Sequence, residues 1–466
     1  MNVSFLLLLL GITLLNSAFG AAAPNASVSP TVSPSPKATD WKNDLQELGR
    51  LISDPAATPE EVHQFIQSHV ADISDLVSSE LSEDGETVLG LSLRVHREDL
   101  FHVLYNDLGK PNLNGDDPSH WETSVFADGL RYGSWGLIEE MRKRGAVDLE
   151  KFTNDAPSDS ESRGRTTDLI VAAGHNSADV IQHLLDEARD VNAVDVSKST
   201  ALMSAADSNT SAEVVRVLLK RGAQVDAQNT AGGTALVYAT QDNRRIEILK
   251  ALLEAHPDIH YQPSWGNPVL ITATETWEPQ RQLLPTVEYL QLLIDAGAQV
   301  DATDSQNRTA LHCAAMSNSA EVVSFLLKKG LNVNQKETDG ETPLYEAARL
   351  NPSVDVIQVL IAAHADLEVK DAASGDTPLT IATSFNPNED VAAALVRAHA
   401  DVHAMDVGGD TVLEDAAVAR RSIGLMRLLI SDGADLGHKD HFGKMALDYA
   451  QTRPQDVIDL LTPKAN

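Results

Sequence analysis

The most reactive side chains of this sequence are a single cysteine and a closely spaced pair of histidines. Cys313 is the only cysteine among the 466 residues, so the chain cannot form an internal disulfide. A catalytic thiol needs a neighbouring base and an open cleft, whereas Cys313 lies beside Ala314 and Ala315 in an apolar run. His438 and His441 have an H-x-x-H spacing, but they lie in a polar stretch between two helical patterns. We therefore predict a buried, inert thiol and a solvated turn.

No other group of residues has the pattern of a catalytic or cofactor site. The sequence lacks a Gly-rich phosphate loop, paired cysteines and a recognisable nucleophile motif. We therefore predict that the protein has no enzymatic activity, no cofactor and no bound metal.

Three histidines share one position of a recurring pattern. His256, His364 and His399 each end an apolar helical run at a position that is glycine in other units. Those glycines are Gly222, Gly297, Gly330 and Gly433. Histidine tolerates a positive φ, and a cation interacts favourably with the C-terminal end of a helix. We predict that these histidines terminate helices; weak pH sensing is the alternative.

The residues around Cys313 belong to a unit that spans 307–334. Thr309 is a favourable residue for capping the start of a helix. Apolar residues recur at helical spacing on both sides of a polar break at 317–319. Gly330 can adopt the left-handed conformation that ends a helix. The pattern predicts two short helices followed by a polar hairpin, and such a pair buries its apolar faces only against copies of itself.

Copies of this unit recur along most of the chain. The position of Thr309 returns at intervals of 33 to 41 residues. It is occupied by Thr167, Thr200, Thr234, Pro268, Thr309, Thr342, Thr377, Thr411 and Met445. Together with the phrase TPLYEAA at 342–348, this period resembles that of the ankyrin repeat family. The resemblance implies an all-α repeat solenoid of stacked helix–turn–helix units with hairpin tips.

The sequence divides into four segments. Residues 1–20 are typical of a signal peptide, and 21–40 form a spacer rich in Ser, Thr and Pro. Residues 41–162 are predicted to form a helical cap and two degenerate ankyrin-like units, with a separate helical domain as the alternative. Residues 163–466 hold nine ankyrin repeats, of which the last is a C-terminal cap with a polar outer face.

The N-terminal segment predicts export from the cytoplasm. Its apolar run, 5–15, is too short to span a bilayer, and Ala18 and Gly20 supply the small residues of a cleavage site. We expect a secreted or otherwise extracytoplasmic protein, which would be periplasmic if the source is bacterial. The segment contains no Lys or Arg, so an uncleaved anchor is the alternative. No later stretch is apolar enough to span a membrane, and we expect a monomer.

Asn25, Asn209 and Asn307 each begin an Asn-x-Ser/Thr sequon. These asparagines are candidate glycosylation positions if the protein is secreted by a eukaryote. Sequons of this kind also arise by chance.

The charge of the chain restricts its partners. Lys and Arg total 36 and Asp and Glu total 68, which gives a formal net charge of −32. This charge repels nucleic acid and anionic membranes and attracts basic surfaces. We therefore predict a protein partner with a basic surface patch.

Ankyrin proteins usually bind partners through hairpin tips and the exposed part of each first helix, and the resemblance carries that surface over by position. The predicted partner-binding residues are Trp265, Trp277, Arg308, Met316, Glu341, Arg349, Asp376, Phe385 and Asp410. Trp265 is a candidate apolar anchor, although packing on a neighbouring loop explains it equally well. We call Glu341, Asp376 and Asp410 the acidic row, because they have equivalent positions in three successive units. A merely solvated rim is the alternative for this row.

These observations favour a secreted or periplasmic binding protein that acts as an effector or scaffold through protein–protein interaction. An inhibitor or immunity protein that blocks a partner enzyme in the periplasm is the alternative. An enzyme on an ankyrin scaffold is a third class, but the chain has no spare domain large enough for one.

Overall fold

The computed structural model describes residues 41–69, 88–107, 113, 124–146, 148–149, 166–241, 245–264, 266–275 and 285–463. The predicted signal peptide and spacer, Asn25, Trp265 and Trp277 lie outside these described residues.

From residue 166 onward the helices come in pairs, which we call the first and second helix of each unit. The first helices are α9 (Asp168–His175), α11 (Ala201–Ser208), α13 (Ala235–Gln241), α15 (Val269–Thr274), α17 (Ala310–Ser317), α19 (Pro343–Leu350), α21 (Pro378–Phe385), α23 (Val412–Val418) and α25 (Ala446–Tyr449). The second helices are α10 (Ala178–Asp186), α12 (Ala212–Lys220), α14 (Ile246–Leu253), α16 (Val287–Asp295), α18 (Ala320–Lys328), α20 (Val354–Ala362), α22 (Glu389–Arg397), α24 (Ile423–Ser431) and α26 (Gln455–Leu461).

The N-terminal part adds further helices to the same stack. They are α1 (Trp41–Ser53), α2 (Pro59–His69), α4 (Val88–Arg94), η2 (Glu98–Leu100), α5 (Phe101–Asp107), α6 (Val125–Tyr132) and α7 (Trp135–Lys143). Helices α1, α4, α6 and α9 contact one another in sequence and so extend the row of first helices. The division of 41–162 into a cap and two degenerate units stays a prediction.

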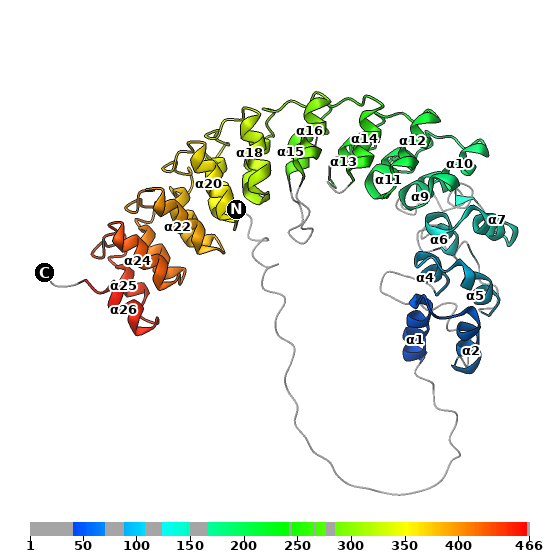
Figure 1. The fold of residues 1–466 in the computed structure, drawn as a ribbon, viewed down its shortest axis with the longest axis horizontal. Coiled ribbons are helices and arrows are strands. Elements are labelled where there is room, and N and C mark those ends of the chain that lie inside the picture. The colour runs from blue at the N-terminus through cyan, green and yellow to red at the C-terminus, as the bar shows by residue number, and fades with distance from the viewer. Residues whose placement is uncertain are drawn as a thin grey trace, which may run out of the picture.

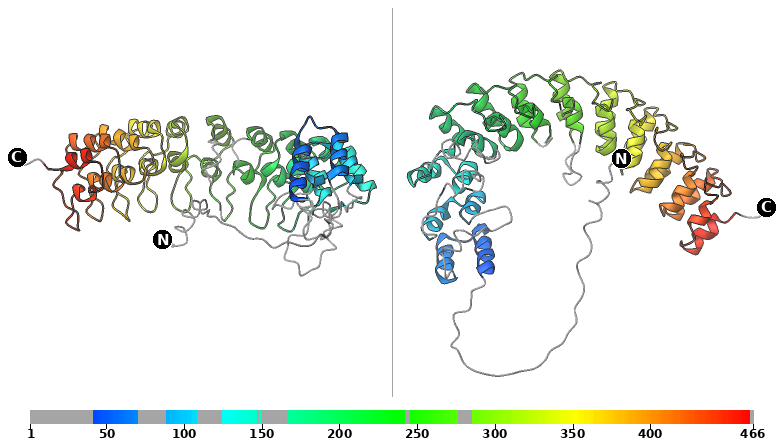
Figure 2. Two further views of the ribbon diagram at one scale, coloured as in Figure 1. Left: turned by 90° about the horizontal axis from the view of Figure 1, so that it is seen from below. Right: turned by 180° about the vertical axis from the view of Figure 1, so that it is seen from behind.

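The units stack side by side into a curved arc. First helices such as α13 and α15 lie on its inner side, and second helices such as α14 and α16 lie on its outer side (Figure 1). Loops between units project to one side of the arc (Figure 2). Along the stack, first helices contact first helices and second helices contact second helices. The described residues contain isolated bridges and no strand, which confirms the predicted all-α repeat solenoid.

Local sequence sets where each helix begins and ends. Thr309 caps α17 through a capping box with His312, and Thr342 caps α19 with Pro343 in the first turn. His256, His364 and His399 have φ values of 50°, 63° and 66°. The predicted role of these three histidines as helix terminators is therefore confirmed, because each one adopts the left-handed conformation that glycine adopts in other units.

The apolar core runs between the two helix rows. Leu326, on α18, is completely buried, as its predicted position on the second helix requires. Cys313 is also buried, among the small residues that allow first helices to approach closely.

Buried asparagines tie each unit to the one before it. The side-chain amide of Asn351 donates to the carbonyl oxygens of Ala315 and Asn318 at 2.9 and 3.1 Å. Asn209 makes the equivalent pair of bonds four units earlier in the stack. Since both hydrogens of each amide are used, these bonds fix the register of neighbouring units.

Candidate protein-binding surface

The candidate binding surface is the inner face, which comprises the hairpins and the exposed sides of the first helices. The backbone amides of Thr338, Ala372 and Val407 each donate to a carbonyl oxygen of the preceding hairpin, at 2.9, 2.8 and 2.8 Å. These bonds hold three successive hairpins side by side. They therefore place the members of the acidic row in one continuous surface.

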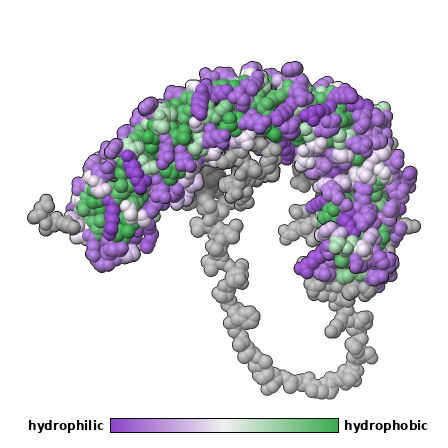
Figure 3. Space-filling view, in the orientation of Figure 1, coloured by the Kyte–Doolittle hydropathy of each residue, from purple (hydrophilic) through white to green (hydrophobic). Residues whose placement is uncertain are grey.

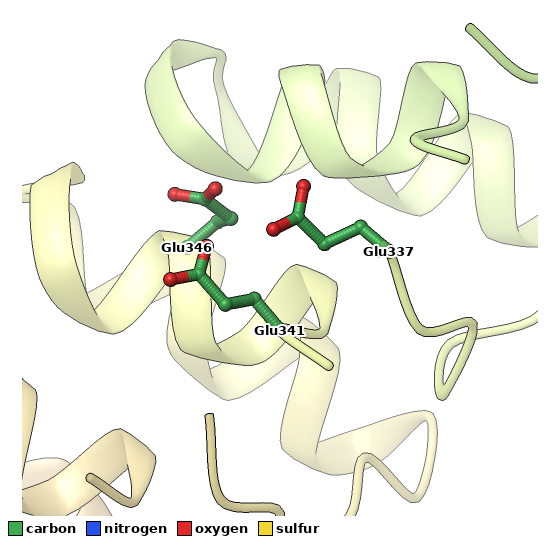
Figure 4. Close-up of side chains that lie close together, drawn as sticks. All are labelled: Glu337, Glu341 and Glu346. Atoms are coloured by element: carbon green, nitrogen blue, oxygen red, sulfur yellow. The ribbon is translucent and has the colours of Figure 1, made fainter. Parts of the chain in front are cut away.

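Three carboxylates converge where the hairpin before α19 meets that helix. The nearest carboxylate oxygens of Glu337, Glu341 and Glu346 all lie within 4.8 Å of one another (Figure 4). Glu346 is buried and pairs with Arg349 at 2.6 Å, and Arg349 also lies 3.8 Å from Glu341. Three oxygens at this spacing could hold a metal ion, but the guanidinium of Arg349 already supplies a cation to two of the three carboxylates.

Burial and crowding change the protonation of this group. Burial, and after it the charge of Glu346, raises the pKa of Glu341 to about 8. Burial also raises the pKa of Glu337. The side chain of Glu341 is only 15% exposed. This member of the acidic row therefore faces its own unit more than it faces solvent, so the row is not a uniform solvated rim.

A second carboxylate group lies on α23 and in the hairpins before α21 and α23. Burial, and after it the charge of Asp376, raises the pKa of Asp415 to about 8. Burial and the neighbouring Asp406 also raise the pKa of Asp410. The Oδ1 atom of Asp410 and the Oδ2 atom of Asp415 are both buried without a hydrogen-bond partner among the described residues. Within the same part of the chain, Asp376, Asp410 and Asp415 form no ion pair, so this group of carboxyl groups lacks the basic partner that Glu346 has in Arg349.

The two predicted arginines are engaged within the chain. Arg308 contacts Asp304 at 2.8 Å and Glu275 at 3.2 Å, and its side chain is 20% exposed. Arg349 is held by Glu346 and Glu341, as described above. Neither guanidinium is thus available as a free donor to a partner.

Apolar side chains border the carboxylates. Leu350, Phe385 and Val418, at the ends of α19, α21 and α23, are 47%, 67% and 59% exposed. Met316 occupies the matching end of α17 and is half-buried. Hydrophobic residues lie in patches among hydrophilic ones along the arc, including its α24–α26 end (Figure 3). The inner face of units α19 to α24 thus combines negative charge with exposed apolar groups.

Sequence reasoning missed three carboxylates of this surface, namely Glu337, Glu346 and Asp415. Glu346 and Asp415 each lie four residues after the threonine that caps their helix. This common register could have identified them.

The described sequons differ in accessibility. Asn209 is 2% exposed, and its side-chain amide donates to Ala173 and Asn176 of the neighbouring unit. A glycan on Asn209 is therefore incompatible with the folded chain, which corrects the sequence-based candidate. Asn307 is exposed at a hairpin tip, where its amide donates to the carbonyl oxygen of Lys336 at 2.7 Å.

The residues that first suggested chemistry have structural roles. Burial raises the pKa of the Cys313 thiol far above its usual range, so the thiol stays protonated and unreactive. His438 Nδ1 lies 3.0 Å from Glu414 Oε2, and that oxygen accepts a hydrogen bond from the backbone amide of Thr411 at 2.7 Å. The prediction of a merely solvated turn is thus wrong for His438, because this histidine fixes a capping carboxylate at the start of α23.

None of the helices that the structure describes combines the length and the hydropathy needed to cross a membrane.

The chain matches known repeat proteins. A family model described as ankyrin repeats (3 copies) matches residues 169–263, 284–371 and 350–440, which together cover more than half of the chain. An ankyrin repeat protein of Fowlpox virus (strain NVSL) is 34% identical over 85 residues, 18% of this chain and 25% of the viral protein. Ankyrin repeat domain-containing protein 37 of Bos taurus is 33% identical over 86 residues, 18% of this chain and 54% of the bovine protein.

A relative and a solved structure extend the comparison. The Neurogenic locus Notch protein of Drosophila melanogaster is 40% identical over 76 residues, 16% of this chain and 3% of the fly protein. The chain therefore spans about half or less of the length of these relatives. The crystal structure of the human ASB11 ankyrin repeat domain matches with a TM-score of 0.44 and 23% identity, over 50% of this chain and 98% of that domain.

The helix pairs, the capping threonines and the family model all indicate the same repeated unit. The chain belongs to the ankyrin repeat family, whose repeats serve protein–protein interaction.

Proposed function

We propose that this protein is an extracytoplasmic ankyrin-repeat effector or scaffold that binds a protein with a basic surface patch on its inner face. The observation that carries this proposal is the group of carboxylates on α23 and its neighbouring hairpins, Asp376, Asp410 and Asp415, which have no cation within the described residues. A net charge of −32 adds a long-range attraction for basic surfaces.

The role is binding and not catalysis. The sole thiol is buried and protonated, and the other carboxylate group, at Glu341 and Glu346, is occupied by Arg349. A surface of this kind acts through complementarity of charge and shape. Charged groups at its rim should mainly set the association rate and the salt dependence of binding, and the apolar groups should set the dissociation rate.

The proposed location rests on the sequence of 1–20. The apolar run and the small residues Ala18 and Gly20 support export and cleavage. N-terminal sequencing of the protein from its natural source should find a first residue near Ala21. Protein that retains Met1 in the cytosol would contradict the extracytoplasmic part of the proposal and leave the binding role intact.

The binding role is tested by affinity capture from the medium or periplasm of the source. Wild-type protein should retain a basic partner at low salt, and the triple variant Glu341/Asp376/Asp410→Ser should retain much less of it. The matched control is Glu321/Asp355/Asp432→Ser, which removes the same number of carboxyl groups from exposed positions on the second helices or just beyond them. Equal capture by all three proteins, with no change between low and high salt, would refute a basic partner on this face.

A further inference from the structure

One pair of carboxylates on the inner face shows how this fold holds a guanidinium group. Arg349, near the end of α19, lies 2.6 Å from Glu346 on the same helix and 3.8 Å from Glu341 in the preceding hairpin. The capping residue Thr342 separates the hairpin carboxylate from the helix. One charged group therefore bridges a hairpin carboxylate and a helix carboxylate.

The same arrangement recurs 69 residues later without its cation. Asp410 occupies the position of Glu341, and Asp415 occupies the position of Glu346. Val418 occupies the position of Arg349. Both carboxylates are thus retained in the unit that begins at Thr411, and the side chain that would neutralise them is replaced by an apolar one.

One oxygen of each carboxyl group in this second pair lacks a hydrogen-bond donor among the described residues, although Asp415 also interacts with the hydroxyl group of Ser384. Asp410 Oδ1 and Asp415 Oδ2 are buried and make no hydrogen bond within the described residues. Other carboxylates surround them, because Asp376 and Asp406 both interact electrostatically with Asp415. Buried carboxylate oxygens without a donor are costly, and a partner that supplies donors would remove this cost.

Apolar groups lie beside the pair. Val418 is 59% exposed, and Phe385, at the end of the preceding first helix, is 67% exposed. The methylene groups of an arginine side chain can cover such surfaces while its head group reaches the carboxylates. An apolar residue next to that arginine would extend the contact across α21 and α23.

We propose that the Asp410–Asp415 pair binds an arginine side chain of the partner, presented by a segment with an apolar residue beside the arginine. This inference rests on the proposed function and specifies the chemistry of its partner. The planar guanidinium suits two carboxylates that come from different elements, because it donates several hydrogen bonds in fixed directions. Arg349 provides that geometry within the same chain.

The test introduces an arginine of the chain itself into the site. Val418→Arg places a guanidinium where Arg349 stands in the earlier unit, and Val418→Gln is the neutral control. The probe is a phage-displayed library of random peptides, selected on the whole wild-type protein. Recovered peptides are then synthesised with their arginine intact and with the arginine replaced by lysine or by citrulline, which has a similar shape and no charge.

The expected peptides carry arginine beside an apolar residue. Val418→Gln removes only the apolar contact of Val418, so it should weaken their binding far less than Val418→Arg does. Binding should weaken at least tenfold with Val418→Arg, with Asp415→Asn, and when lysine or citrulline replaces arginine. Thermal unfolding and circular dichroism of each variant check that the fold is intact. Undiminished binding by Val418→Arg, or equal binding of the lysine peptide, would overturn the arginine assignment. So would loss of binding on addition of EDTA, which would indicate a metal ion instead.

The two proposals fail in different ways. Basic peptides that lose affinity for Glu341/Asp376/Asp410→Ser, but not for Val418→Arg or Asp415→Asn, would leave the basic-partner function standing and refute this arginine site. Recovered peptides without basic residues, which bind every variant equally at all salt concentrations, would refute both.

Discussion

Burial acts on individual titratable residues of the inner face in opposite directions. It raises the pKa of Asp415 to about 8, and it lowers the pKa of His312 to about 4. In both cases burial favours the neutral form of the side chain. The two residues therefore give the folding stability opposite dependences on pH.

We predict that Asp415→Asn stabilises the protein in alkaline solution. The folded pKa lies above the value of about 3.9 expected in the unfolded chain, so the contribution of Asp415 is fully present below pH ~3.9 and is lost as the pH rises through ~8. At pH ~9 the variant should gain on the order of 1 kcal/mol over wild type, since asparagine carries no charge to bury. Urea unfolding at pH ~5 and ~9 measures this difference. The exposed Asp432→Asn is the control; an equal gain there would point to net charge alone.

We predict the opposite pH dependence for His312. Its folded pKa of about 4 lies below the unfolded value of about 6.5, so its contribution is present above pH ~6.5 and is lost as the pH falls toward 4. The shift corresponds to about 3 kcal/mol. The stability advantage of wild type over His312→Gln should therefore shrink by about that amount between pH ~7 and ~4. The exposed His403→Gln is the control variant. A constant difference for His312→Gln, or an equal change in both variants, would contradict the assignment.

The sequence predicted single residues well where the cause was local. The histidines at helix ends and the buried Cys313 follow from positions within one unit. Arg308 and Arg349 were predicted as partner contacts, but both pair with carboxylates of the chain itself. The partner of Arg308 at Glu275 lies 33 residues away, and the sequence does not show which side chains meet across a unit boundary. Asn209 was misjudged for the same reason, since its hydrogen-bond acceptors belong to the preceding unit.

At the scale of elements, the pattern of capping threonine, apolar run and terminal glycine or histidine was enough to predict the helix pairs. The reason is physical: each signal acts within one or two turns of its own helix. The hydrogen bonds between units were not predicted, because Asn351 looks in the sequence like an ordinary polar residue of a turn. Its two acceptors, Ala315 and Asn318, become neighbours only after the units stack.

We predict that Leu326→Ala destabilises the protein by about 2–5 kcal/mol, the usual range for removal of a buried leucine side chain. Leu326 is completely buried on α18, which contacts α17 and α20. The adjacent Leu327 is only partly buried, so Leu327→Ala should cost clearly less. Urea unfolding midpoints of wild type, Leu326→Ala and Leu327→Ala measure these differences in stability. Equal midpoints for wild type and Leu326→Ala would show that the buried face of α18 has been misassigned.

At the scale of the whole molecule, the arc distributes charge unevenly. Ion pairs occur in its N-terminal part, where Arg142 and Arg189 contact Asp148, Asp168 and Glu187. The units around α21 and α23 instead carry unpaired carboxylates. The repeat period predicted the solenoid, but it could not predict this division, because the period does not show which charged side chains of neighbouring units meet.

This distribution leads to a prediction for the effect of salt on folding. A chain of net charge −32 repels itself when compact, and raising NaCl from about 20 mM to about 500 mM shortens the Debye length from about 20 Å to about 4 Å. The thermal midpoint should therefore rise with salt. The ion pairs of Arg142 oppose this effect only weakly, because Asp168 is buried and buried pairs are screened less than exposed ones. The rise of the thermal midpoint should be smaller in the triple variant Asp376/Asp410/Asp415→Asn, because this variant relieves clustered repulsion. The control is the triple variant Glu321→Gln with Asp355/Asp432→Asn, which removes three scattered exposed charges and should keep the larger rise. A midpoint that falls with salt would show that ion pairs, and not the unpaired carboxylates of the inner face, dominate the electrostatic energy of the fold.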